Sequence, residues 1–257
     1  MAAPHLPSGH TILVPNQFLS LPQEQQIVER YRKFRLYSLQ VDPQAFSSTY
    51  DDESQFPYDT WLSRIQNPAG KTFVSLGGLS TEAEEISKSN NPDSLDGTKS
   101  SLGELLSREW VGIVTLIGPG VFLKPNDDSP TVNKTWEVFI QNGRYQIPLA
   151  ASKSDDLQGA HLVYLVVGMF VSPSARRRGH GRRLLEATIE AAAEESAMLG
   201  ASKTSITVQV ETVNPTALPL YESLGFHVTE KIIDIQNRQG IPSQVVSLEK
   251  EIELPKL

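Results

Sequence analysis

A nearly unbroken apolar run at residues 162–171 restricts the fold of this chain more than any other feature. Side chains on both faces of the run are apolar, as in a central β-strand that other elements cover on both sides. A polar turn follows, and then residues 181–199, in which Leu185, Ile189 and Ala192 recur at helical spacing. A buried strand, a tight loop and an amphipathic helix in succession predict an α/β protein.

Further helices and strands are expected on either side of this unit. Apolar residues at helical spacing predict helices, and β-branched or continuous apolar segments predict strands. The expected helices are 23–39, 58–65 and 217–224, and the expected strands are 11–14, 71–76, 109–117, 204–210, 226–235 and 244–252.

Two stretches depart from the pattern of a compact domain. Residues 80–101 are rich in Ser, Asn, Asp, Glu and Gly, which cannot offset the entropy lost on ordering, so we expect a mobile surface insertion. Residues 124–160 form a second insertion, where 136–140 and 145–149 could make a hairpin around Asn142-Gly143. Neither a repeat nor a composition shift marks a boundary, so we expect a single domain over positions 1–257.

Composition and charge argue against several classes of protein. The 23 Lys and Arg residues are outnumbered by 30 Asp and Glu, a net charge of −7, which disfavours nucleic-acid or anionic-membrane binding. The absence of cysteine excludes disulfide frameworks, thiolate nucleophiles and Cys-ligated zinc, and we expect no metal. The N-terminus lacks the features of a signal peptide, and the longest apolar run is about half a membrane span. We therefore expect a cytoplasmic protein, with the nucleus also open, that is a monomer or a homodimer.

The loop after the apolar strand contains two glycines and a run of arginines. Amides at the start of a helix lack intrahelical acceptors and lie at the positive end of the helix dipole, which favours an anion. Gly179 and Gly181 let an anion approach, because a Cβ would obstruct it or forbid the backbone conformation. The loop therefore predicts a phosphate or pyrophosphate site.

Other interpretations of this loop are weaker. The dinucleotide-binding fingerprint requires glycine where Leu184 stands, and the phosphate-binding loop of nucleotide triphosphatases requires Gly-Lys-Ser or Gly-Lys-Thr, which is absent. Taken alone, residues 176–183 are also compatible with a solvated basic turn or a nuclear-import-like patch.

Two motifs in the right order resemble the GNAT superfamily of N-acetyltransferases. They read Arg176-x-x-Gly179-x-Gly181 and Asn214-x-x-Ala217-x-x-x-Tyr221-Glu-x-x-Gly225-Phe226. The strong part of the resemblance covers residues 162–226. It implies a mixed, mostly antiparallel sheet with a splayed strand pair and helices on both faces. It also implies direct transfer of an acetyl group from acetyl-CoA to a primary amine.

The resemblance further implies a set of cofactor contacts. The main chain of the strand before the loop would pair with the pantetheine arm, with Gly168 easing a bulge. The amides of residues 177–182 would hold the pyrophosphate. The expected acetyl-CoA-binding residues are Met169, Phe170, Val171, Arg176, Arg177, Arg178, Gly179, His180, Gly181, Arg182, Asn214 and Tyr221.

Two of these residues have alternative interpretations. The resemblance makes Tyr221 the proton donor to the departing CoA thiolate, whereas a Tyr beside Leu220 and Leu224 is also typical of core packing. Asn214 would contact the cofactor or order the next helix, and as a helix N-cap before Pro215 it has a structural reason of its own.

The general base is left unassigned. Family members that place Glu or His on the strand before the loop differ from this chain, where the matching Leu165 and Val167 are apolar. The remaining candidates are also compatible with surface charges, and are Glu211, His161 and Glu109. The missing strand carboxylate keeps a second function open, a CoA-binding sensor or scaffold of the same fold without turnover.

The acceptor amine is open as well. In the family, specificity would lie in segments matching roughly 40–65 and 235–243. The first contains acidic residues that could draw a cation or could be solvated loop charges, namely Asp42, Asp51, Asp52 and Glu53. A protein N-terminus, a lysine, a polyamine and a small drug-like amine all remain possible.

Overall fold

A single mixed sheet organises the chain. The computed structural model describes residues 10–18, 20–79, 101–122, 134–141, 144–145, 157–236 and 242–255. Within them a seven-stranded sheet has the order β1-β2-β3-β6-β7-β9-β8, and all neighbours are antiparallel except β6 and β7. The strands are β1 (His10–Leu13), β2 (Gly70–Leu79), β3 (Arg108–Val121), β6 (His161–Val171), β7 (Lys203–Glu211), β8 (His227–Gln236) and β9 (Pro242–Glu253).

Helices cover both faces of the sheet. They are α1 (Leu21–Val41), α2 (Tyr50–Ser54), α3 (Tyr58–Ile65), α5 (Ser101–Ser107), α6 (His180–Met198) and α7 (Leu218–Glu222). Short 3-10 segments are η1 (Pro43–Ala45), η2 (Thr135–Phe139), η3 (Pro173–Ala175) and η4 (Pro215–Ala217). None of the helices in the described ranges is long and apolar enough to cross a membrane.

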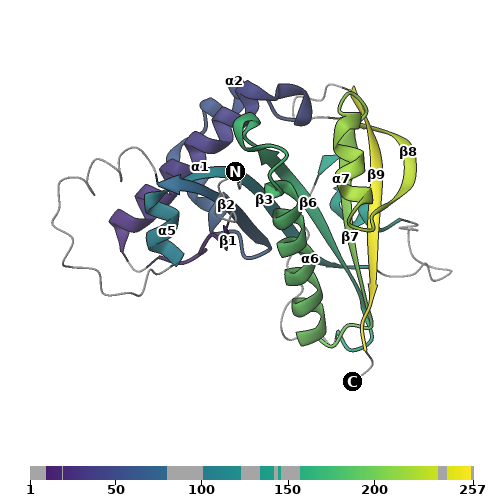
Figure 1. Ribbon diagram of the computed structural model, residues 1–257. Helices are drawn as coiled ribbons and strands as arrows, with labels where there is room; N and C mark the ends of the chain where they lie inside the picture. The colour runs from purple at the N-terminus through teal and green to yellow at the C-terminus, as the bar shows by residue number, and fades with distance from the viewer. Residues whose placement is uncertain are drawn as a thin grey trace, which may run out of the picture.

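The core is divided between the two faces because successive strand residues point to opposite sides. Val114 packs with Leu185 of α6 on one face, whereas Ile113 packs with Ile27 of α1 and Trp61 of α3 on the other. Figure 1 shows α6 lying along β3 and β6. The predicted mixed, mostly antiparallel sheet with helices on both faces is thus confirmed.

Some local expectations were wrong or incomplete. The predicted strand at 136–140 is mainly η2. Among the described residues, β4 (Ile140–Gln141) and β5 (Arg144–Tyr145) pair antiparallel, as the predicted hairpin requires, and 146–149 lie outside them. The helices α2 and α5 were not predicted. Most of the expected mobile insertion, residues 80–100, lies outside the described residues, as do 146–156 of the second insertion.

Candidate active site

The parallel strands β6 and β7 separate part of the way along their length. Their register runs from His161 and Lys203 to Val166 and Val208, and then ends. Beyond that point β7 stays paired with β9, and β6 stays paired with β3 as far as Val171. Residues 167–171 of β6 and 209–211 of β7 therefore face one another across an opening, and the predicted splayed strand pair is confirmed.

A bulge in β6 lies at the start of this opening. Phe170 pairs with Ile113 of β3 and Val167 pairs with Thr115, so β6 contains one more residue than β3 over this stretch. Gly168 occupies the bulge with a φ of +64°, and a Cβ there would meet nothing within 4 Å. Backbone conformation, and not lack of space, is therefore what favours glycine at this position.

The loop after β6 turns into the start of α6 through two left-handed residues. Arg177 has a φ of +63°, and Gly179 is the N-cap of α6 with a φ of +80°. The amides of residues 177–179 donate to no backbone carbonyl of the described residues, and those of the first helical turn lack intrahelical acceptors. These amides can therefore bind an anion at the positive end of the α6 dipole.

Gly181 has a packing role in addition to the predicted one. A Cβ there would lie 3.2 Å from Cδ2 of Leu220 and 3.3 Å from Cε of Met169. Such contacts are tighter than ordinary van der Waals distances, so glycine lets α6 approach both β6 and α7 closely.

Most of the loop arginines are engaged within the protein. Arg176 donates from Nε to the carbonyl of Val171 at 3.0 Å and from Nη2 to Oδ2 of Asp42 at 2.8 Å. Arg183 and Arg182 contact the carbonyl of Arg178 and the carboxylate of Glu186, respectively. Within the described part of the chain, the exposed side chains of Arg177 and Arg178 form no ion pair, and they are available for phosphate oxygens.

The His180 side chain is turned into the protein beneath the loop. Its Nδ1 lies 2.8 Å from Oγ of Ser75, and the ring is buried. Burial, followed by the charges of Arg183 and Arg178, lowers the pKa of His180, so the ring is neutral at pH 7. His180 thus has its backbone amide, and not its ring, at the anion-binding loop.

A cavity of about 1290 Å³ occupies the opening between β6 and β7. Its wall includes Leu165, which packs with Phe139 of η2, and Val166 and Val208, which belong to the core on the α6 face of the sheet. The cavity therefore extends from one face of the sheet to the other through the opening between β6 and β7. The segment at residues 45–48, which connects α1 to α2, also lines it.

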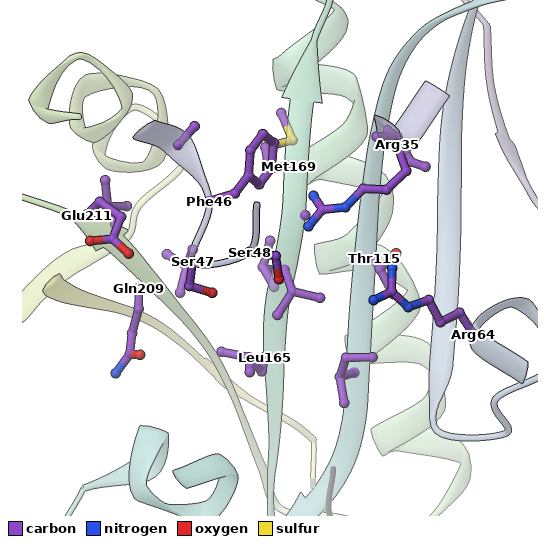
Figure 2. A pocket seen from close by; sticks show the side chains of 18 of the residues that line it. Arg35, Phe46, Ser47, Ser48, Arg64, Thr115, Leu165, Met169, Gln209 and Glu211 are labelled. Carbon is purple, nitrogen blue, oxygen red and sulfur yellow. The ribbon is translucent and has the colours of Figure 1, made fainter. Parts of the chain in front are cut away.

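Polar side chains line the cavity on two sides. Figure 2 shows Arg35 and Arg64 on one side of the strand that carries Leu165 and Met169, and Glu211 on the other. The two arginines come from α1 and α3, and Glu211 ends β7. Segments distant in the sequence thus meet at one site.

Only part of the predicted cofactor-binding set lines the cavity. Met169, Asn214 and Tyr221 do so. Phe170 instead points its ring into the core, 5.8 Å from the ring of Phe34 in α1, so its main chain alone is at the strand edge. Val171 packs partly buried against the α6 side of the core. The residues from Arg176 to Arg182 form the loop and the first turn of α6, and none of them lines the cavity.

Tyr221 is both a core residue and a residue of the cavity wall. It is 4% exposed, and its ring packs edge-on against Phe226 at 5.6 Å. Burial raises the pKa of Tyr221 well above its usual value, so the hydroxyl keeps its proton at neutral pH and can act as a donor.

Asn214 forms the turn between β7 and η4. Its carbonyl accepts from the amide of Ala217 at 3.3 Å, and its Oδ1 accepts from Oγ1 of Thr216 at 3.0 Å. Its side chain is half-buried on the cavity wall. The turn-forming role and a position at the site therefore coexist.

The three candidate bases lie in different places. Glu211 lines the cavity, whereas Glu109 is exposed on β3 and does not. His161, at the opposite end of β6, bonds through Nε2 to Oγ of Ser205 at 2.7 Å. Leu165 and Val167 line the cavity with apolar side chains, as the sequence indicated.

Two of the acidic residues of the α1–α2 region, Asp42 and Glu53, form ion pairs with arginines of the protein. Asp42 pairs with Arg176. Glu53 is 1% exposed and accepts from Arg35 at 3.0 and 2.9 Å and from Arg64 at 2.7 Å. Burial by itself raises the pKa of Glu53, but the hydrogen bonds and charges of Arg35 and then Arg64 outweigh it and lower the pKa to about 2. The expectation that Glu53 could be a solvated loop charge was therefore wrong.

Comparisons with known proteins agree with the geometry. The acetyltransferase (GNAT) domain model matches residues 147–228, and no curated protein is similar in sequence. The structure of Arabidopsis thaliana NAA60 with a bisubstrate analogue superposes with a TM-score of 0.50 at 10% identity, covering 95% of this chain and all of that one. The structure of NAA60 with acetyl-CoA superposes with a TM-score of 0.47 at 12% identity, covering 95% of this chain and 99% of that one. The structure of phosphinothricin acetyltransferase from Sinorhizobium meliloti superposes with a TM-score of 0.45 at 13% identity, covering 96% of this chain and 89% of that one. The predicted resemblance is confirmed: the GNAT domain model matches residues 147–228 of this chain, and the fold is similar to that of NAA60.

Proposed function

We propose that this protein is an acetyl-CoA-dependent N-acetyltransferase that moves an acetyl group directly to a primary amine. The observation that carries the proposal is the opening between β6 and β7, which holds the cavity and lies next to the loop at the start of α6. A strand edge without a partner can hydrogen-bond an extended amide-containing chain, and the loop amides can bind a diphosphate. The pantetheine arm and the diphosphate of CoA have these two chemistries in this order.

The reaction joins the amine nitrogen to the thioester carbonyl carbon and breaks the bond from that carbon to sulfur. The main-chain amide of Met169 would stabilise the oxyanion that forms at the carbonyl oxygen. Tyr221, buried and neutral, would give its proton to the departing thiolate. Holding both substrates in one cavity removes much of the entropic part of the barrier.

The attacking amine must also lose a proton. Glu53 is unsuited to accept it, because two arginines hold both of its oxygens and its pKa is about 2. Glu211 is the other carboxylate on the described cavity wall, and water in the open cavity offers a second route to solvent.

The first experiment measures acetyl-CoA and CoA binding by isothermal titration, together with release of CoA thiol in the presence of amines. Gly179→Glu should abolish binding, because it adds bulk and negative charge at the N-cap of α6 and strains a residue with φ +80°. Gly78→Glu is the matched control, since Gly78 is exposed on β2 and a Cβ there meets nothing within 4 Å. Tight CoA binding by the Gly179 variant would refute the proposed pocket.

A second function, a CoA-binding sensor or scaffold without turnover, is favoured by the apolar Leu165 and Val167 on the cavity wall and by the paired state of Glu53. It shares the binding site but predicts no chemistry. Sustained thiol release with any amine, at a rate above hydrolysis, would rule it out.

A further inference from the structure

The wall of the cavity formed by α1 and α3 carries more positive than negative charge. Arg35 and Arg64 share the single carboxylate of Glu53, with N···O distances between 2.7 and 3.0 Å. Their side chains are 13% and 19% exposed, and that of Glu53 is 1% exposed. Two guanidinium groups against one carboxylate leave a net charge of +1 on this wall.

One donor in this group has no partner. Arg35 uses Nε and Nη2 to bind Glu53, while its Nη1 is buried and finds no hydrogen-bond acceptor among the described residues. A guanidinium presents five N–H groups and cannot lose its charge at physiological pH. A buried charged donor left unpaired is costly, so a donor of this kind on a cavity wall marks a place where an anionic acceptor fits.

The two arginines are held in place before anything binds. The guanidinium of Arg35 lies 4.5 Å from the ring centroid of Phe46, and that of Arg64 lies 4.9 Å from Phe56 and 5.0 Å from Trp61. Stacking and the shared Glu53 together fix both side chains. Binding of an anion there would therefore cost little side-chain conformational entropy.

A purely structural ion pair explains less of this arrangement. One bidentate arginine already engages both oxygens of Glu53, so Arg64 is not needed to neutralise it. Figure 2 shows Glu211 on the opposite side of the cavity from Arg35 and Arg64. The cavity is thus polarised, with the surplus positive charge at one side and a carboxylate at the other.

From these contacts we infer that the acceptor is an amine that also carries a carboxylate, such as a small amino acid, and that Arg35 and Arg64 bind this carboxylate. The inference rests on the proposed function, and it names the substrate class of the same site. Arg35 would donate to this carboxylate from Nη1, which Glu53 leaves unused, in a charge-assisted hydrogen bond. A polyamine would instead bring positive charge to a wall that is already positive.

The decisive test uses the unaltered protein. Thiol release is measured with α-, β- and γ-amino acids, each compared with its carboxamide and its decarboxylated amine. We expect kcat/KM to be at least about tenfold higher for the best acid than for its two neutral counterparts, since loss of a charged hydrogen bond costs this much or more. Equal or higher kcat/KM with the amides, the simple amines or a peptide with a blocked C-terminus would overturn the inference.

Substitutions of Arg35 then test whether this residue causes the preference for acceptors that carry a carboxylate. Arg35→Gln should raise KM for the acid by about tenfold or more while leaving KM for acetyl-CoA unchanged, because the loop that would bind the diphosphate lies elsewhere. Lys33→Gln is the control, since its side chain is 71% exposed on the same helix. Arg35→Lys keeps the charge next to Glu53 and tests the fork geometry if the glutamine variant does not fold. Retention of the full acid preference by a folded Arg35 variant would overturn the assignment.

The two proposals fail in different ways. Acetyl-CoA binding without thiol release from any amine would overturn the enzymatic function and this inference together. Thiol release that does not depend on a carboxylate in the acceptor would overturn this inference alone and leave the acetyltransferase function standing.

Discussion

The hydroxyl of Tyr221 is a single group whose role can be separated from packing. Tyr221→Phe keeps the buried ring and its edge contact with Phe226 but removes the hydroxyl that we propose as the proton donor. We expect kcat to fall by about 100-fold or more, the usual contribution of a general acid, with little change in the affinity for acetyl-CoA. The measurements are steady-state kinetics and isothermal titration.

Tyr58→Phe serves as the control for this prediction, because Tyr58 is exposed on α3 and absent from the cavity wall. Unchanged turnover in Tyr221→Phe would remove Tyr221 from the mechanism and leave it a core residue.

Glu53 should make the free energy of unfolding depend on pH under acidic conditions. Its pKa is about 2 in the folded chain against an ordinary 4.5, so its contribution is fully present above about pH 4.5 and is lost as pH falls toward 2. The difference corresponds to about 3 kcal/mol. We expect the difference in unfolding free energy between the wild type and Glu53→Gln, measured by urea unfolding, to be constant from pH 6 to about pH 5 and to narrow from there to pH 3. A difference that stays constant over the whole range would contradict the assigned ion pair.

The residues that carry motifs were predictable from the sequence, and the arginine wall was not. Gly179 and Tyr221 belong to patterns with fixed spacing, so their neighbourhood is encoded locally. Arg35 is 18 positions from Glu53, and Arg64 is 11 positions from it. A pair of this kind forms only when α1, α2 and α3 are packed together, and no local pattern signals it.

At the level of elements, the bulge in β6 can be tested with a single methyl group. Gly168→Ala should destabilise the fold by about 1 kcal/mol, because φ +64° strains any residue with a Cβ, although no atom lies in the way. If the strand relaxes, acetyl-CoA affinity should fall as well. Gly78→Ala is the control, since a Cβ there also meets nothing within 4 Å and Gly78 has no positive φ.

Urea unfolding and isothermal titration measure the two effects. Unaltered stability and affinity in Gly168→Ala would show that the bulge does not depend on glycine.

Elements with a clear period were predicted well, and short ones were not. The helix predicted at 58–65 coincides with α3, and the strand predicted at 162–171 differs from β6 by one residue. α2 has five residues and α5 has seven, too few to display a helical period. In η2, Phe139 is fully buried within a 3-10 turn, and an apolar residue of this kind favoured the wrong assignment of a strand.

At the scale of the whole molecule, the site depends on the position of one parallel pair in an otherwise antiparallel sheet. β6 and β7 are adjacent in the middle of the strand order, with three strands on one side and two on the other. The family resemblance predicted that the strand before the loop is splayed from its neighbour, with a bulge near Gly168, and the structure confirms both. Composition and periodicity alone gave neither the strand nor the position. The pairing of β6 with β7 ends after Val166 and Val208. Beyond this point β6 stays paired with β3, and β7 stays paired with β9.

An unsatisfied strand edge ordinarily invites a second chain to add to the sheet and begin aggregation. Here residues 167–171 carry such an edge at an interior position of the sheet, and the segment at 45–48 lines the same cavity. A foreign strand would have to enter between two strands that converge a few residues away, at Val166 and Val208. The backbone groups of residues 167–171 are therefore placed to hydrogen-bond a small molecule in the cavity, whereas the converging strands hinder the addition of another polypeptide strand.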